Sequence, residues 1–209
     1  MRGHFDNHLN LRQLILTRYP KLIVECGAGN GDCTRMLAYL KLMYDFELHS
    51  ISDKELDIPE VEWHTGLSYK ELPKFENDSI ELLIIDTDHN YWTLEKELAA
   101  AEPKMKEGGW IVMHDVEEFY HDTGMAMSYW TGDPYPAEEI KKTGLEKGGL
   151  GDAVIDFLSA RRGKFKLVRF MPEHFGIAVI EKKTVSQVRL ITPGPEPVFA
   201  QAPLCPPSA

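Results

Sequence analysis

The chain has 209 residues, of which 43% are hydrophobic and 27% charged, and its mean hydropathy is -0.30. These values are typical of one globular domain and exclude a collagen-like or disordered chain. No apolar run reaches the roughly 20 residues of a membrane span, and the first residues lack the apolar core of a secretory signal. We therefore expect a cytoplasmic protein without a membrane partner. The net charge of -10 repels phosphate backbones, which argues against nucleic acid as a partner.

Short apolar runs alternate with amphipathic stretches, an order typical of a parallel sheet with helices on both faces. Strands are expected over Lys21–Glu25, Phe46–Ile51, Val61–Thr65, Ser79–Ile85 and, after a turn at Gly108-Gly109, Trp110–Met113. Helices are expected along the stripe Met36, Leu37, Leu40, Met43 and Tyr44, over Trp92–Met105 with Leu94, Leu98, Ala101 and Met105 inward, and over Gly151–Arg162. Phe165–Phe170 and Phe175–Glu181 are predicted to form an antiparallel pair.

Two segments differ from the rest of the chain. Residues 116–149 are rich in aromatic, glycine and proline residues, which favours a lid or substrate-binding segment. Residues 192–209 hold six prolines and one charged residue, so they are predicted to form an extended or disordered tail. Residues 1–191 are then expected to form a single domain.

The three cysteines, Cys26, Cys33 and Cys205, are odd in number and show no CxxC spacing. Neither a disulfide framework nor a structural zinc site is expected from them. We interpret Cys26 and Cys33 as packed small residues.

A glycine-rich loop, Glu25-Cys26-Gly27-Ala28-Gly29-Asn30-Gly31, follows the first strand. Alternate glycines let the backbone turn sharply and let a ligand approach the peptide groups, so a nucleotide-like ligand is expected here. The dinucleotide fingerprint G-x-G-x-x-G would need glycine at position 32, where Asp32 stands. An acid there opposes a pyrophosphate and favours a positively charged ligand without phosphate. S-adenosylmethionine meets both conditions.

The ordered motifs at the predicted strand ends resemble class I S-adenosylmethionine-dependent methyltransferases over about residues 20–182. They are E-x-G-x-G-x-G after the first strand, Asp53 after the second, Asp86-Thr87-Asp88-His89-Asn90-Tyr91 after the fourth, and Gly108-Gly109 with His114-Asp115 around the fifth. Within that superfamily the chain is similar to the metal-dependent O-methyltransferases that act on sugars of macrolide and aminocoumarin antibiotics. The resemblance implies an α/β fold, with a doubly wound, Rossmann-like, mostly parallel seven-stranded sheet whose last strand is antiparallel.

The resemblance also implies a set of cofactor-binding residues: Glu25, Gly27, Ala28, Gly29, Gly31, Asp53, Gly66, Ser68 and Asp86. The glycines would contact the methionine and ribose side of S-adenosylmethionine, and Glu25 would help to hold the loop and the cofactor's amino end. Asp53 would accept hydrogen bonds from the ribose hydroxyls, although an Asp there is also favoured as a helix N-cap. Gly66 and Ser68 would flank the adenine.

Asp86, His114 and Asp115 would hold one divalent metal in this resemblance, with Asp88 as general base and His89 as the alternative base. Oxygen ligands suit Mg²⁺, or Mn²⁺ when an imidazole joins them. Two positions depart from the related patterns. His114 replaces the acid of the sugar methyltransferases, and Val116 stands where catechol-type enzymes carry an Asn ligand. Without a metal, these carboxylates would cap helices and His114 would be a core histidine.

The expected activity is transfer of a methyl group from S-adenosylmethionine to an oxygen of a small-molecule acceptor, assisted by the metal. Two alternatives remain open at this stage. One is a metal-independent methyltransferase acting on a nitrogen or a small acid, and the other is a catalytically silent member that binds only the cofactor. The sequence identifies neither the acceptor nor the oligomeric state, and a homo-oligomer remains open.

Overall fold

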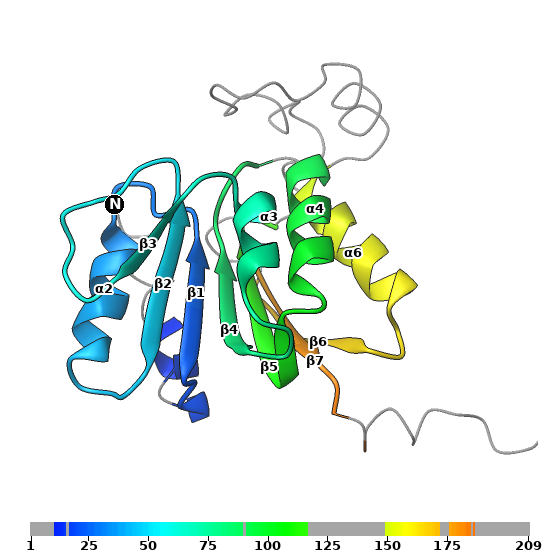
Figure 1. Cartoon of the computed structure of the whole chain (residues 1–209). Coiled ribbons are helices and arrows are strands. Elements are labelled where there is room, and N and C mark those ends of the chain that lie inside the picture. Colours follow the sequence, from blue (N-terminus) through cyan, green and yellow to red (C-terminus); the bar gives the residue numbers. More distant parts are fainter. Residues whose placement is uncertain are drawn as a thin grey trace, which may run out of the picture.

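The computed structural model describes residues 11–15, 17–89, 91–116, 149–171, 176–184 and 186. Its centre is a seven-stranded sheet with the strand order β3-β2-β1-β4-β5-β7-β6 (Figure 1). The strands are β1 (Leu22–Cys26), β2 (Glu47–Ser52), β3 (Glu62–Thr65), β4 (Ile80–Ile85), β5 (Met105–His114), β6 (Phe165–Met171) and β7 (Ile177–Lys182). The helices are α2 (Asp32–Lys41), α3 (Ser68–Glu71), the 3₁₀ helix η1 (Leu72–Lys74), α4 (Tyr91–Ala101) and α6 (Leu150–Ala160).

The strand directions confirm the predicted fold class. β1, β2, β3, β4 and β5 pair in parallel, whereas β7 is antiparallel to both of its neighbours, β5 and β6. β1 has β2 on one side and β4 on the other, so the direction of strand progression reverses between β1 and β4. In open α/β sheets ligands bind outside the carboxyl ends of the strands at such a reversal. The topology therefore predicts a ligand site at the carboxyl edge of the sheet, which lies uppermost in Figure 1.

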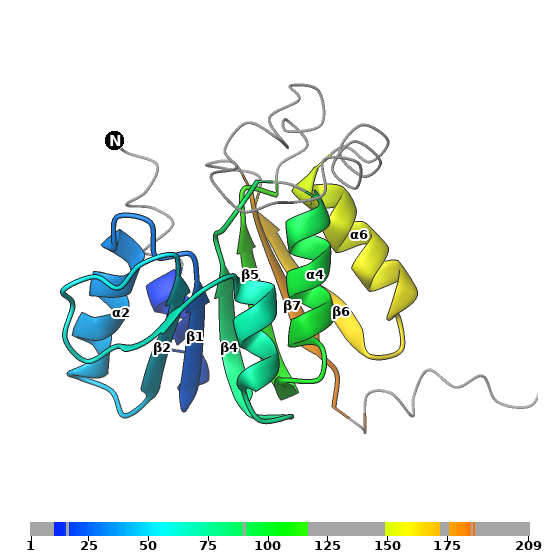
Figure 2. The same cartoon turned by 45° about the horizontal axis from the view of Figure 1, so that its top comes forward.

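Two apolar layers cover the two faces of the sheet. On one face, α3, α4 and α6 lie side by side (Figures 1 and 2), and buried residues such as Leu98 and Phe157 pack against Leu83 and Ile111. On the other face, Leu37 and Leu40 of α2 pack in a second buried layer, together with Leu11 and Ile15. Residues 11–15 and 17–18 are helical, and none of the described helices is both long and apolar enough to cross a membrane.

The boundary between α4 and β5 corrects the sequence prediction. The expected helix over Trp92–Met105 ends at Ala101, and the expected turn at Gly108-Gly109 lies inside β5. The main-chain N–H of Lys104 donates to the Ala101 carbonyl at 2.8 Å, which closes the turn that ends the helix. Met105 then pairs with Ile80, and the pairing of β4 with β5 shifts register after that residue. A Cβ at Gly109 would lie 2.8 Å from the Lys106 carbonyl oxygen, so this irregularity in the strand requires glycine.

Helix α2 is also shorter than the apolar stripe in its sequence predicts. α2 ends at Lys41, and Met43, which was expected to face inward, is 48% exposed. The helix expected over Gly151–Arg162 and the antiparallel strand pair are confirmed by α6 and by the pairing of β6 with β7. The predicted lid over 116–149, apart from its two end residues, and the tail over 192–209 lie outside the described residues. The extent of the single domain over 1–191 stays a prediction.

Candidate functional site

The glycine-rich loop leaves β1 at the reversal point of the sheet. Gly27, Gly29 and Gly31 all have positive φ angles of 91°, 53° and 84°. A Cβ at Gly27 would overlap the main-chain oxygen of Asp86 at the end of β4, whereas a Cβ at Gly29 would meet nothing within 4 Å. Position 27 thus requires glycine, because the chain leaving β1 packs closely against the chain leaving β4 there. Gly29 borders open space, as expected for a backbone that a ligand approaches.

Glu25 lies beneath this loop and is 1% exposed. Its Oε2 accepts hydrogen bonds from Thr34 Oγ1 at 2.7 Å and from Ser50 Oγ at 2.8 Å. Its Oε1 is buried and has no hydrogen-bond partner among the described residues. Burial raises the pKa of this carboxyl, and hydrogen bonds from the Thr34, Ser50 and Cys33 side chains oppose that rise. Glu25 therefore offers one unused acceptor next to the loop.

The other predicted cofactor residues lie along the same edge of the sheet. Asp53 directly follows β2, is exposed and accepts a hydrogen bond from Ser52 Oγ at 3.2 Å. Gly66 follows β3, and its main-chain N–H donates to the Ser52 carbonyl at 2.9 Å. Ser68 is buried at the start of α3, where its hydroxyl donates to Glu97 Oε1. The Ser68 hydroxyl thus has a partner inside the protein.

Asp86, His114 and Asp115 come together as predicted, at the carboxyl ends of β4 and β5. Their candidate ligand atoms all lie within 4.8 Å of one another. His114 Nδ1 is 3.1 Å from Asp115 Oδ2 and 3.5 Å from Asp86 Oδ1. Asp115 has a φ of 58°, a left-handed value that Asp tolerates better than most residues.

The charges in this cluster are strongly coupled. Burial alone would lower the pKa of His114, but the two neighbouring aspartates outweigh it and raise that pKa to about 10. Burial would likewise raise the pKa of Asp115, but hydrogen bonds from His114 and His89 lower it to about 2. With these pKa values the cluster contains the ionised carboxylate of Asp115 next to the imidazolium of His114. A cation ligated by His114 would have to displace its proton.

The two candidate bases, which follow β4, have different partners. His89 Nε2 is 2.9 Å from Asp115 Oδ2, and this hydrogen bond raises the pKa of His89. Asp88 is instead directed toward α4, with its Oδ2 3.5 Å from Thr93 Oγ1. The structure therefore brings His89, more than Asp88, into contact with the predicted metal ligands.

A buried polar network beside the site was not predicted from the sequence. Glu97 on α4 is fully buried, and its Oε1 accepts hydrogen bonds from the Ser68 and Thr87 hydroxyls. Burial raises the pKa of Glu97 to about 7. The signal was present in the sequence, because Glu97 falls on the inward stripe of the helix that contains Leu94 and Leu98.

The two cysteines predicted to be packed residues behave as expected for inert thiols. Cys26 is fully buried at the end of β1, and burial raises the pKa of both the Cys26 and the Cys33 thiol. Reactive cysteines have lowered pKa values instead. Cys205 lies outside the described residues.

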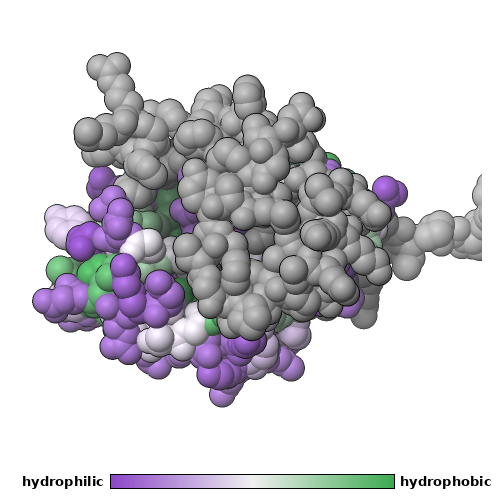
Figure 3. Space-filling view, turned by 90° about the horizontal axis from the view of Figure 1, so that it is seen from above, coloured by the Kyte–Doolittle hydropathy of each residue, from purple (hydrophilic) through white to green (hydrophobic). Residues whose placement is uncertain are grey.

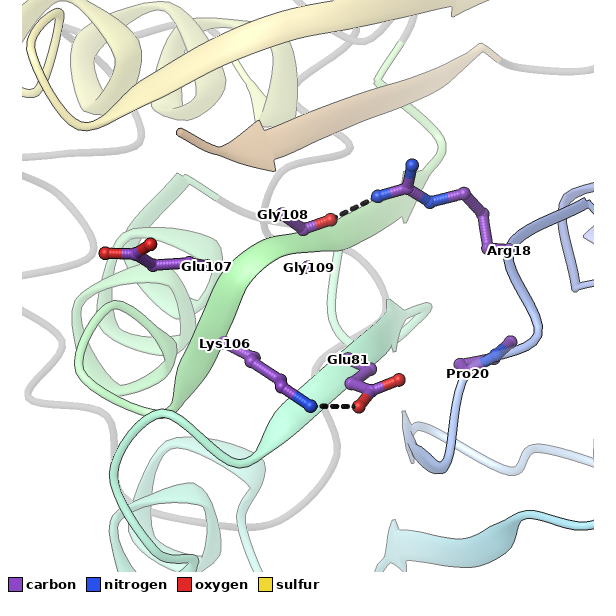
Figure 4. Close-up of a pocket in the computed structure, with 7 residues that line it drawn as sticks. All are labelled: Arg18, Pro20, Glu81, Lys106, Glu107, Gly108 and Gly109. Atoms are coloured by element: carbon purple, nitrogen blue, oxygen red, sulfur yellow. Dashed lines mark hydrogen bonds and ion pairs between the residues drawn. The ribbon is translucent and has the colours of Figure 1, made fainter. Parts of the chain in front are cut away.

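A pocket of about 250 Å³ lies at the opposite edge of the sheet, where β4 and β5 begin (Figure 4). Its cationic groups already have partners, because Lys106 Nζ is 2.5 Å from Glu81 Oε1 and Arg18 donates to the Gly108 carbonyl. Figure 3 views the molecule from above, toward the carboxyl edge of the sheet. The described side chains visible there are mainly hydrophilic, with smaller hydrophobic patches. The candidate site at the carboxyl edge thus lies away from this pocket.

Comparisons with known proteins give one family match and several similar folds. Residues 24–116 match the family model described as a methyltransferase domain. An O-methyltransferase from Bacillus cereus in complex with S-adenosylhomocysteine superposes with a TM-score of 0.56 at 15% identity, over 85% of this chain and 81% of that chain. The Podospora anserina methyltransferase PaMTH1, bound to S-adenosylhomocysteine, gives 0.59 at 14% identity, over 85% and 78%. The protein has a methyltransferase fold.

A third similar structure is MycE, the methyltransferase of the mycinamycin biosynthetic pathway, in complex with Mg, S-adenosylhomocysteine and mycinamycin VI. It gives a TM-score of 0.55 at 16% identity over 86% of this chain, which spans only 48% of MycE. No curated protein sequence matches the chain. Together, the family match over residues 24–116 and the solved structures show the fold of a methyltransferase domain.

Proposed function

We propose that the protein transfers a methyl group from S-adenosylmethionine to an oxygen of a small-molecule acceptor, with the help of a divalent metal. The observation that supports this most is the position of Asp86. Its main-chain oxygen packs against Gly27 of the glycine loop, and its carboxylate lies 3.5 Å from His114 in the acidic cluster. A cofactor on the loop and a metal at the cluster would therefore lie side by side.

The described residues fit S-adenosylmethionine. The unused Oε1 of Glu25 can accept a hydrogen bond from a cationic or amide donor, and the space beside Gly29 admits the ligand to the backbone. The cofactor carries an ammonium and a sulfonium charge and no phosphate, which suits a loop followed by Asp32. In this proposal the exposed Asp53 binds the ribose hydroxyls, and Gly66 and Ser68 flank the adenine.

The cluster at the ends of β4 and β5 also fits a cation. Two carboxylates and one imidazole within 4.8 Å are a donor set that Mn²⁺ accepts readily and that Mg²⁺, which prefers oxygen, accepts less readily. Asp86, His114 and Asp115 would hold the ion. When bound, it would lower the pKa of the acceptor hydroxyl.

The reaction is an in-line displacement, in which the acceptor oxygen forms a bond to the methyl carbon as the bond from that carbon to sulfur breaks. The products are the methyl ether or ester and S-adenosylhomocysteine. Correct placement of the two reactants can lower the barrier by roughly 7–11 kcal/mol in well-oriented systems. The acceptor's proton passes to a base, either Asp88 or His89. His89 is favoured by its contact with Asp115, because a carboxylate that orients an imidazole is a common general-base arrangement.

One observation favours a second candidate, a metal-independent methyltransferase. The raised pKa of His114, about 10, means that its imidazolium can itself balance the charges of Asp86 and Asp115. In that case the pair His89 and Asp115 would act without a cation, and Asp86 would be structural.

Metal removal separates the two candidates. Acceptor candidates would be screened for formation of S-adenosylhomocysteine with the protein as purified, after EDTA treatment, and after addition of Mg²⁺ or Mn²⁺. Loss of turnover in EDTA and its recovery with a cation support the metal-assisted reaction, whereas full turnover in EDTA supports the second candidate. Absence of turnover with every acceptor, despite cofactor binding, would favour a catalytically silent protein.

A further inference from the structure

A second cluster of possible metal ligands lies at the edge of the sheet and shares no residue with the first. His49 on β2 is paired with Glu62 on β3, and His64 is two residues further along β3. Side chains two residues apart on a strand point to the same face, so these three share one face. His49 Nδ1 is 2.9 Å from His64 Nε2. Glu62 Oε1 lies 3.8 Å from the first of these nitrogens and 4.0 Å from the second.

These spacings suit a tetrahedral transition-metal ion. Two ligand atoms bound at about 2.0–2.1 Å to tetrahedral Zn²⁺ lie about 3.3 Å apart. The observed separations of 2.9, 3.8 and 4.0 Å fall on both sides of that value. Small side-chain movements would therefore place all three atoms on one ion. Two imidazoles and one carboxylate with a free fourth position are also a ligand set that zinc adopts in proteins.

The surroundings hold the two imidazoles in place. Their rings are stacked, with centroids 5.2 Å apart, and the ring of Phe75 packs at 5.3 Å from His49 and 5.2 Å from His64. The side chains of His49 and His64 are 13% and 23% exposed, whereas that of Glu62 is 68% exposed. The site is thus closed by Phe75 on one side and open to water at Glu62, because β3 is the edge strand.

A carboxylate also lies near the other nitrogen of His49. A metal-bound imidazole usually donates its second N–H to a carboxylate or carbonyl, which fixes the ring. Glu47 Oε2 is 3.9 Å from His49 Nε2 on the same face of β2. Glu47 could accept that hydrogen bond after a small movement of its exposed side chain.

We propose that His49, Glu62 and His64 bind one Zn²⁺ ion or a similar borderline divalent ion, with the fourth position open to water. The ion cross-links the edge strand β3 to β2. It therefore steadies the chain from Gly66 to Ser68, which follows β3 directly. The alternative is a simple hydrogen bond between the two imidazoles, with no affinity for metal.

The test is a competitive Zn²⁺ titration against a chromophoric chelator, made in an Asp115→Asn background that weakens the strand-end cluster. In that background His64→Gln should lower Zn²⁺ affinity by about 100-fold or more, and Glu62→Gln by about tenfold or more. The matched control is Glu76→Gln, which removes the same charge from an exposed position after η1 and should leave the affinity unchanged. Equal Zn²⁺ affinity in His64→Gln and its parent would overturn the proposal.

A second measurement uses the chain without substitutions, in case a histidine variant folds poorly. Imidazole ¹⁵N spectra should show that Zn²⁺ shifts the Nδ1 of His49 and the Nε2 of His64 to values typical of metal-bound nitrogen. Spectra in which these nitrogens keep sharing a proton at saturating Zn²⁺ would identify a hydrogen-bonded pair only and reject the site. Neither measurement uses a methyl donor or turnover, so the outcome is independent of the proposed methyl transfer.

Discussion

Gly27 and Asp86 are in direct main-chain contact across the point where the strand order reverses. A side chain at Gly27 would overlap the main-chain oxygen of Asp86, and the Asp86 N–H donates to the Cys26 carbonyl at 2.9 Å. One contact therefore fixes both the start of the glycine loop and the residue that links it to the acidic cluster. The loop and the cluster are expected to respond together when this contact is disturbed.

Substitutions at two glycines should separate folding from cofactor binding. Gly27→Ala should lower the free energy of unfolding by about 2–4 kcal/mol, because it adds both a steric overlap and a left-handed backbone strain. Gly29→Val also introduces left-handed backbone strain but no steric overlap, since nothing lies within 4 Å of its Cβ, so it should leave the core folded. It should abolish cofactor binding by filling the space beside the loop. Denaturant unfolding and calorimetry with S-adenosylmethionine measure the two effects. Normal cofactor affinity in Gly29→Val would show that the loop is not the binding site.

Asp115→Asn should weaken metal binding at the strand-end cluster by at least about tenfold and leave cofactor affinity within a few-fold. Asn tolerates the positive φ at this position, so the backbone should persist. The loss follows from the removal of an anionic ligand that His89 and His114 both contact. Titration with Mn²⁺ followed by calorimetry with the cofactor checks both results. If Mn²⁺ affinity stayed the same, the metal would have to lie elsewhere.

The base can be identified by paired substitutions that keep the metal ligands intact. His89→Gln should lower turnover by roughly 10²–10⁴-fold, and Asp88→Asn should lower it much less. Because the pKa of His89 is raised, its imidazole is still largely protonated at a pH equal to the ordinary pKa of histidine. It can accept a proton only at a higher pH. The turnover of the parent protein should therefore increase with pH, and His89→Gln should lose that dependence. The opposite ranking of the two variants would assign the base to Asp88.

The buried Glu97 should make stability depend on pH. Its pKa is raised from 4.5 to about 7, so its contribution to stability is complete below pH 4.5 and is lost as the pH rises through about 7. Between about pH 6 and about pH 8.5 the parent should lose about 1–3 kcal/mol of unfolding free energy that Glu97→Gln retains. Glu95→Gln, at an exposed position of the same helix, is the control and should behave like the parent. Parallel pH profiles for Glu97→Gln and the parent would mean that Glu97 ionises normally.

The sequence was sufficient to predict the parallel sheet and the proximity of Asp86, His114 and Asp115 at its edge. Short, mostly apolar runs such as Ile80–Ile85 are typical of interior strands, and the acids that follow such strands meet at one edge of a parallel sheet. The end of α4 was misplaced for a physical reason. Met105 packs in the same buried layer as Leu98 and Ala101, so it continues the helical stripe in sequence while belonging to β5 in space.

Hydrophobic periodicity in the sequence does not predict features that depend on contacts between different helices and strands. Glu97 is buried because hydroxyls from α3 and from the turn after β4 meet it, and neither partner is near it in the sequence. The cluster of His49, Glu62 and His64 depends on the register of β2 against β3, which no local pattern specifies. The proximity of His89 to Asp115 likewise follows from the packing of β4 beside β5.

Binding of S-adenosylmethionine tests the central claim most directly, because it needs no knowledge of the acceptor. Isothermal titration calorimetry should show one site for S-adenosylmethionine and for S-adenosylhomocysteine in the parent protein, no binding of either to Gly29→Val, and no binding of NAD. Absence of heat with both S-adenosyl compounds, together with binding of NAD, would contradict the assignment of the glycine loop and with it the proposed methyl transfer.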